Sequence, residues 1–136
     1  MNIRKTSGKN FFLFALLLLL FSLGVPAYAK DSAAISYQKV SQNKVVFAVE
    51  VSSPAPSSLI VQHYHSSDNN LVAASPRAQR IDNGRGYSKW LLKGVRPGVY
   101  PFSLTFSKNV RPGNIQLILR YRDPRGGRFF EKSVRP

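Results

Sequence analysis

The sequence predicts an all-β protein, an antiparallel sandwich of two sheets that follows a short N-terminal leader. Three observations support this fold class. Apolar and polar residues alternate with a period of two along the segments after residue 30, which is typical of strands with one buried and one solvated face. Proline, glycine, asparagine and aspartate interrupt these segments at intervals that suit short strands. No segment there has the 3.6-residue period of a useful helix.

Residues 1–29 have the pattern of a cleavable signal peptide. The basic head consists of Arg4, Lys5 and Lys9. An uncharged apolar run follows at 11–25, and Ala27-Tyr28-Ala29 supplies the small residues that predict cleavage before Lys30. An uncleaved anchor is the alternative, although the run is shorter than the ~20 residues that span a bilayer. We therefore expect one exported domain at residues 30–136, periplasmic or secreted, with no membrane span after cleavage.

The first strands of the domain follow from alternation and from the turns between them. The clearest is 44–52, where valine or phenylalanine occupies every second position from Val45 to Val51. Pro54 and Pro56 then mark a turn, because proline removes a donor from the strand ladder. The other strands expected in this half lie near 33–39, 57–64 and 71–74.

The later strands include the single tryptophan. In the strand expected at 87–93, Trp90 shares a face with Leu92, and we predict that it is buried between the sheets. A turn at 123–127, Asp-Pro-Arg-Gly-Gly, predicts a hairpin between the last two strands. The remaining strands are expected at 99–106, 114–122 and 128–134.

Two apolar stretches begin with the same four residues. Val95-Arg96-Pro97-Gly98 recurs as Val110-Arg111-Pro112-Gly113. Proline fixes one dihedral angle and glycine permits a positive φ, so each segment can reverse the chain between sheets or neighbouring strands. We expect two similar corners at one end of the sandwich, with the valines closing the core and the arginines exposed.

The order of elements within residues 44–107 resembles the Ig-like repeat modules of bacterial surface and secreted proteins, the DUF11-type group. The segments that carry the resemblance are Ser75-Pro76, Trp90, Leu92, Pro97-Gly98 and Leu104. The resemblance implies an Ig-like or fibronectin-III-like sandwich outside the membrane, and it transfers no catalytic residue. The Leu-Pro-x-Gly step of those modules is replaced here by the residues at 65–72, and the hairpin after Phe106 has no clear counterpart.

The composition narrows the possible functions. The chain has no cysteine, so the fold depends on core burial and strand pairing, and thiolate metal sites and thiol nucleophiles are excluded. Without the leader, 17 basic residues remain against six acidic ones, a formal charge of about +11. Such a charge attracts polyanions and makes association sensitive to salt, although it also serves solubility alone.

His63 and His65 are the only weak metal candidate. Two residues apart on a strand, they would lie on the same face and could share a Zn²⁺ or Cu²⁺ ion with Asp68 as a third ligand. The alternative is two neutral histidines on the solvated face of the strand. Structural zinc usually takes four protein ligands, so we expect no metal and no cofactor.

No arrangement of residues suggests catalysis. The six acidic residues show no spacing typical of a working pair, and neither Gly-x-Ser-x-Gly nor His-Glu-x-x-His occurs. Chemistry must be argued from converging groups. The sequence therefore favours a protein that is not an enzyme.

Arginines are the strongest functional signal. Arg120 and Arg122 lie two apart on the outward side of one strand, with Tyr121 inward, and Arg125 and Arg128 belong to the same hairpin. Guanidinium groups match carboxylate and phosphate with a planar fork of donors. The alternative is a solvated face that protects an edge strand. The predicted binding residues are Arg120, Arg122, Arg125, Arg128, Arg96 and Arg111.

The sequence thus predicts a non-enzymatic exported module that binds an anionic envelope polymer or an acidic partner protein. The alternative is a structural or accessory subunit of a surface assembly that pairs through an edge strand. Nucleic acid is a weaker candidate, because no stacking row or recognition helix accompanies the charge.

Overall fold

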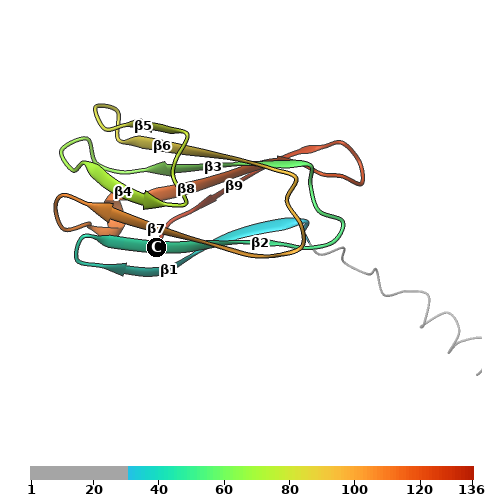
Figure 1. Cartoon of the computed structure of the whole chain (residues 1–136), viewed down its shortest axis with the longest axis horizontal. Helices are drawn as coiled ribbons and strands as arrows, with labels where there is room; N and C mark the ends of the chain where they lie inside the picture. Colours follow the sequence, from blue (N-terminus) through green and yellow to red (C-terminus); the bar gives the residue numbers. More distant parts are fainter. Residues whose placement is uncertain (1–30) are drawn as a thin grey trace, which may run out of the picture. The chain divides into compact units, whose positions relative to one another are not determined.

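The computed structural model describes residues 31–136, which form two antiparallel sheets packed face to face (Figure 1). The predicted signal peptide and the cleavage site before Lys30 lie outside the described residues. The four-stranded sheet has the order β1-β2-β7-β4, and the five-stranded sheet has the order β5-β6-β3-β8-β9. The elements are β1 (Ala33–Ser41), β2 (Lys44–Val51), β3 (Ser58–Tyr64), β4 (Leu71–Ser75), β5 (Arg80–Asp82), β6 (Tyr87–Lys93), β7 (Gly98–Phe106), η1 (Pro112–Asn114), β8 (Gln116–Arg122) and β9 (Phe129–Val134).

The predicted fold class is confirmed, and each predicted strand is present. Alternation is the reason, since the inward residues of β2 and β7 are buried and their outward neighbours are more exposed. The hairpin between β8 and β9 is also confirmed. β5 was not predicted, because three residues give too short an alternation to detect. Among the residues described, none forms a helix with the length and hydropathy that a bilayer crossing requires.

Trp90 is fully buried between the sheets, as predicted. Its ring packs edge-on against Phe47 and Phe102, with centroid distances of 5.9 and 5.6 Å. Its Nε1–H donates to the carbonyl of Pro76 at 2.8 Å, so the one polar atom of the side chain is satisfied. This aromatic cluster joins β2 and β7 of one sheet to β6 of the other.

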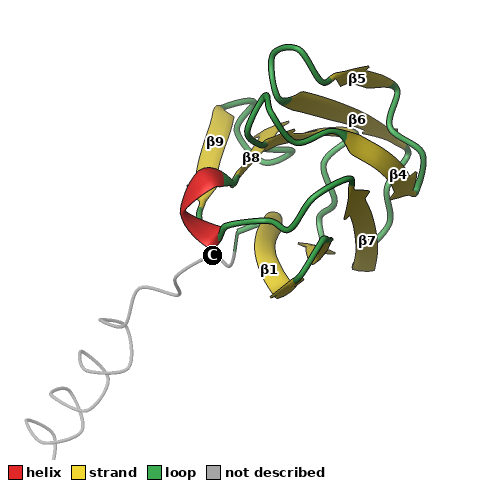
Figure 2. Cartoon of the chain, turned by 90° about the vertical axis from the view of Figure 1, so that its left-hand side faces the viewer, coloured by secondary structure: helices red, strands yellow, loops and turns green. Residues whose placement is uncertain are grey.

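The two Val-Arg-Pro-Gly corners both carry the chain from one sheet to the other, but they do not lie at one end. The first precedes β7 and the second follows it, so they are separated by the length of a nine-residue strand. The physical reason is that both corners flank a single strand. Figure 2 faces the end that contains the second corner, with η1 in red.

The corners also differ in backbone geometry. Gly98 has φ +151°, a value that favours glycine, whereas Gly113 lies in the 3₁₀ turn and has no positive φ. The expectation of a positive dihedral at both glycines is therefore wrong at Gly113. At the first corner the Tyr100 hydroxyl accepts from the Arg96 N–H at 2.8 Å and donates to the Arg96 carbonyl at 2.7 Å. A 3₁₀ bond from Asn114 N–H to the Arg111 carbonyl, 2.9 Å long, closes the second corner.

Candidate binding face on the five-stranded sheet

The outer face of the five-stranded sheet carries two of the predicted binding residues, Arg120 and Arg122, and several residues that were not predicted. The inward residues of β3, Leu59 and Val61, are buried, so Ile60, Gln62 and Tyr64 point to the outer face. Strand register then places the outward residues of neighbouring strands in rows. The basic residues of these rows are Arg80, Lys89, Arg120 and Arg122, and the aromatic ones are Tyr64, Tyr87 and Phe129.

The hairpin arginines are held in place by neighbours on β9. The Nε–H of Arg120 donates to Glu131 Oε2 at 2.8 Å, and the two residues face each other in the β8–β9 ladder. The Arg122 guanidinium carbon lies 4.6 Å from the centroid of Phe129, a cation–π contact. Tyr121 is buried and stacks on Phe130, as the alternation predicts. Glu131 therefore offsets the charge of Arg120, whereas Arg122 makes no ion pair within residues 31–136.

Arg125 and Arg128 lie in the exposed β8–β9 turn. The turn is shaped by Asp123, whose side chain accepts from the Arg125 N–H at 3.0 Å and whose N–H donates to the Arg128 carbonyl at 2.7 Å. Beside this turn a hollow of about 380 Å³ opens on the outer face. Its lining includes Ser58, Ile60, Arg120, Arg122 and Phe129.

A second hollow, of about 310 Å³, lies farther along the same face. Arg80, Arg85, Gln62 and the two tyrosines that line it were missed by sequence reasoning. Alternation does assign Gln62 and Tyr64 to the side of β3 opposite the apolar residues. What the sequence does not give is the pairing of β3 with β6 and of β6 with β5, which brings these residues together.

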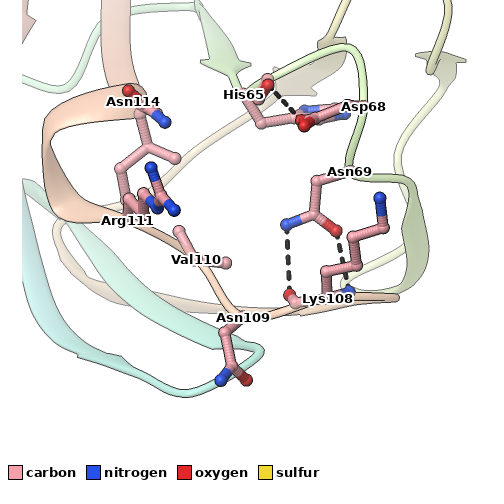
Figure 3. Close-up of a pocket in the computed structure, with 10 residues that line it drawn as sticks. His65, Asp68, Asn69, Lys108, Asn109, Val110, Arg111 and Asn114 are labelled. Atoms are coloured by element: carbon pink, nitrogen blue, oxygen red, sulfur yellow. Dashed lines mark hydrogen bonds between the residues drawn. The ribbon is translucent and has the colours of Figure 1, made fainter.

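The two corner arginines lie at different ends. Arg96 follows β6, whose last residue, Lys93, pairs with Ser58 at the end of the sheet that holds the β8–β9 turn. Arg111 lies beyond the other end of β7, so it does not join the hairpin arginines. It lines a smaller polar pocket of about 210 Å³ with Lys108 and Asn114 (Figure 3).

That smaller pocket is built around a clamped loop. The Asn69 side chain donates to the Lys108 carbonyl at 3.1 Å and accepts from the Lys108 N–H at 2.9 Å (Figure 3). The Ser66 hydroxyl donates to the Asp68 carboxylate and lowers the pKa of that exposed group. The two bonds between Asn69 and Lys108 join the loop after β3 to the segment after β7, so the pocket has a structural explanation.

His63 and His65 are buried, which corrects the placement of both on a solvated face. His63 has the same parity as Leu59 and Val61 on β3, and its ring stacks on Phe47 with centroids 6.1 Å apart. Burial, and secondarily the charge of His65, lowers the pKa of His63 from 6.5 to about 3. Burial also lowers the pKa of His65.

Each histidine of this pair has one ring nitrogen with a hydrogen-bond partner and one without. His63 Nε2 lies 3.2 Å from the Tyr37 hydroxyl, and burial raises the pKa of Tyr37. His65 Nε2 lies 3.3 Å from Asn83 Oδ1. Both Nδ1 atoms lack a partner within residues 31–136. The same part of the chain holds no group of three residues able to ligate a metal, and Asp68 does not complete one with the histidines.

The outer face carries groups that can bind a ligand. It offers guanidinium groups, three aromatic rings and two shallow hollows on a rigid sheet, in an arrangement suited to an extended chain. Searches of family models, curated proteins and solved structures found no match to this chain, so its likeness to the surface-repeat modules stays a prediction.

Proposed function

We propose that this protein is an exported, non-enzymatic module that binds an anionic polymer of the cell envelope through the outer face of its five-stranded sheet. The observation that carries the proposal is the grouping of Arg80, Lys89, Arg120 and Arg122 with exposed or half-exposed aromatic rings on that one face. The predicted leader and the basic composition agree with an exported binding protein.

The placement of the shifted pKa values supports binding over catalysis. His63 and Tyr37, whose pKa values move most, are packed among core aromatic rings and not in the two hollows of the outer face. Their shifts follow from burial, which is a packing effect. On the outer face the acidic residues Asp82 and Glu131 each lie beside an arginine, Arg85 and Arg120. Such pairs orient the arginine side chains.

A structural subunit that pairs through an edge strand is the second candidate function. An acidic partner protein is an alternative ligand for the same outer face. Three features weaken edge pairing among the strands described. β5 has three residues, β4 pairs irregularly with β7, and the β1 register shifts between Tyr37 and Lys39. Short and bulged edges discourage the addition of a strand. β9 is the more regular edge, and a partner strand there would bind with little dependence on salt.

The test replaces Arg120, Arg122, Arg125 and Arg128 by glutamine and measures retention on immobilised heparin at several salt concentrations. We expect most retention to be lost and the salt dependence to fall, because each lost contact releases one fewer counterion. The matched control removes the same charge elsewhere, at Lys39, Lys44, Lys108 and Arg111, and should retain most of the binding.

Equal losses in the two quadruple variants would show that only net charge matters and would overturn the assignment of the face. Unchanged binding and unchanged salt dependence in the arginine variant would make these residues edge protection. The structural-subunit function would then take the place of polymer binding.

A further inference from the structure

The second hollow has features that select a ligand more narrowly than charge does. It lies where β3, β5 and β6 run side by side, at the end of the outer face away from the β8–β9 turn. Register places Tyr64, Tyr87 and Asp82 in one row across these strands. The lining residues are Gln62, Tyr64, Arg80, Asp82, Arg85 and Tyr87.

Gln62 forms the floor of this hollow and is only 6% exposed. Its Nε2 donates to the Tyr87 hydroxyl at 3.1 Å, so the Tyr87 hydroxyl proton stays available for another acceptor. Its Oε1 is buried and has no donor within residues 31–136. A buried carbonyl without a donor is unfavourable, because folding removes its hydrogen bond to water and supplies no replacement. The floor therefore presents an acceptor that lacks a donor beside a donor that can still be used.

The walls of the hollow carry both signs of charge. Arg80 makes no ion pair with any of residues 31–136. Arg85 Nε lies 3.8 Å from Asp82 Oδ2, and the Arg85 side chain is 81% exposed. The Tyr64 and Tyr87 rings are 5.5 Å apart and tilted by 48°, which adds an apolar flank. A ligand that satisfies all these groups must supply hydrogen-bond donors and an anion together.

We infer that this hollow is a subsite for one carboxylated sugar, a hexuronate unit of an acidic polysaccharide. A hexuronate has hydroxyls that donate to Gln62 Oε1 and to Asp82, and a carboxylate that fits the fork of Arg80 or Arg85. An anionic polymer without hydroxyls, such as polyphosphate, supplies the anion but not these donors. Tyrosine rings tilted by 48° flank a puckered sugar better than they make the flat platform on which bases stack.

The inference rests on the proposed function, because the same face binds the polymer and this hollow binds a single sugar residue of it. A volume of about 310 Å³ is at the small end of ligand sites, in keeping with a single sugar. The arginines near the β8–β9 turn supply attraction that does not depend on hydroxyls. Specificity for the sugar then comes from Gln62 and Tyr87.

The experiment measures binding of polygalacturonate and of polyphosphate to the mature protein, the second probe having charge without sugar hydroxyls. We expect Gln62→Met to weaken polygalacturonate binding about tenfold, the effect of one lost hydrogen bond to a charged or hydroxylated ligand, and to leave polyphosphate binding unchanged. Gln116→Met is the matched control. Gln116 belongs to β8 and pairs with Tyr64 of β3, but it does not line the hollow. It should bind both probes as the wild type does.

Tyr87→Phe is the second variant and decides the matter if Gln62→Met lowers the melting temperature. It removes the donor and keeps the ring, so it too should weaken polygalacturonate binding alone. If both variants bind polygalacturonate as the wild type does, while the four-arginine variant loses binding, the subsite is wrong and the proposed function stands. If the wild type binds neither probe, both are wrong. An equal loss on oligothymidylate would replace the sugar by nucleic acid.

Discussion

The two Val-Arg-Pro-Gly segments can be compared directly, since each joins the four-stranded sheet to the five-stranded sheet at one end of β7. The first corner is held by two hydrogen bonds between the Tyr100 hydroxyl and the main chain of Arg96, and it uses a glycine of positive φ. The second is a 3₁₀ turn with ordinary dihedral angles. Four identical residues thus adopt different backbones, because the partner that fixes each corner comes from outside the repeat.

The two ends of the sandwich also differ in the groups that surround the corners. The first corner lies at the end with the basic β8–β9 turn, whereas the second lies near the buried histidines and the clamped Asn69 loop. The following predictions test whether the two ends depend on different interactions.

Trp90→Ala should give the largest loss and sets the scale for the comparison. The ring is fully buried against Phe47 and Phe102, and truncation of such a side chain costs about 3–5 kcal/mol of unfolding free energy. Urea titration followed by circular dichroism measures the loss. Tryptophan emission of the folded wild type should be blue-shifted and protected from quenchers, and a red-shifted, quenchable emission would contradict the core position.

Acidification should weaken the second corner's end more than the first. The pKa of His63 is about 3 in the folded protein and 6.5 when unfolded. Its contribution to the free energy of unfolding is therefore full above pH 6.5 and falls as the pH drops toward 3. From pH 7 to 4.5 this amounts to about 2–3 kcal/mol. The lowered pKa of His65 acts with the same sign.

Urea titrations at pH 7 and 4.5 measure that loss, with His63→Leu as the comparison. The variant removes the titrating group, so its stability should change less over the same range. Amide exchange at pH 4.5 should rise first in the strands around His63. An equal loss of unfolding free energy between pH 7 and 4.5 in the variant and the wild type would assign the acid sensitivity to other groups.

Gly98→Val and Gly113→Val separate the corners most sharply. At Gly98 the φ of +151° is unfavourable for a branched side chain, and a loss of about 1–3 kcal/mol is expected. At Gly113 nothing lies within 4 Å of an added Cβ and φ is not positive, so the change should stay within about 0.5 kcal/mol. Matched denaturation curves check both, and equal losses would mean that the corners share a backbone requirement.

Tyr100→Phe should affect only the first corner. It removes both hydrogen bonds to Arg96 while it keeps the ring, and an exposed pair of this kind contributes about 1 kcal/mol. The second corner has no tyrosine within its turn to remove. Thermal melting of Tyr100→Phe, alone and combined with Gly98→Val, measures the coupling between the two changes, which should be less than additive.

Arg96→Gln and Arg111→Gln should have the smallest effect. Both side chains are exposed, and single exposed charges change stability by less than about 1 kcal/mol. Melting temperatures of the two variants should stay close to that of the wild type. A clear loss in only one of them would reveal a structural role for that arginine.

Alternation predicted the strands and the buried tryptophan because it depends only on neighbours along the chain. It did not predict which strands pair, so the meeting of β3 with β6 and β8 and the second hollow were missed. His63 was assigned to solvent by its polarity, although it has the parity of Leu59 and Val61. The predicted position of the corners at one end was wrong for a similar reason. A repeated segment does not specify which end of a strand it flanks.

The pairing of β2 with β7 has a consequence for how fast the domain forms. Val51 faces Gly98 and Lys44 faces Thr105, so the four strands from β3 to β6 all lie in the loop that this pairing closes. Entropy must be lost over that whole loop before the contacts of Phe47 with Phe102 are gained. All-β domains with such distant pairings reach the native state in roughly milliseconds to seconds, much more slowly than helical domains of similar size. Until β7 arrives, the alternating apolar edge of β2 is open to other chains, and a slow search at high protein concentration favours aggregation.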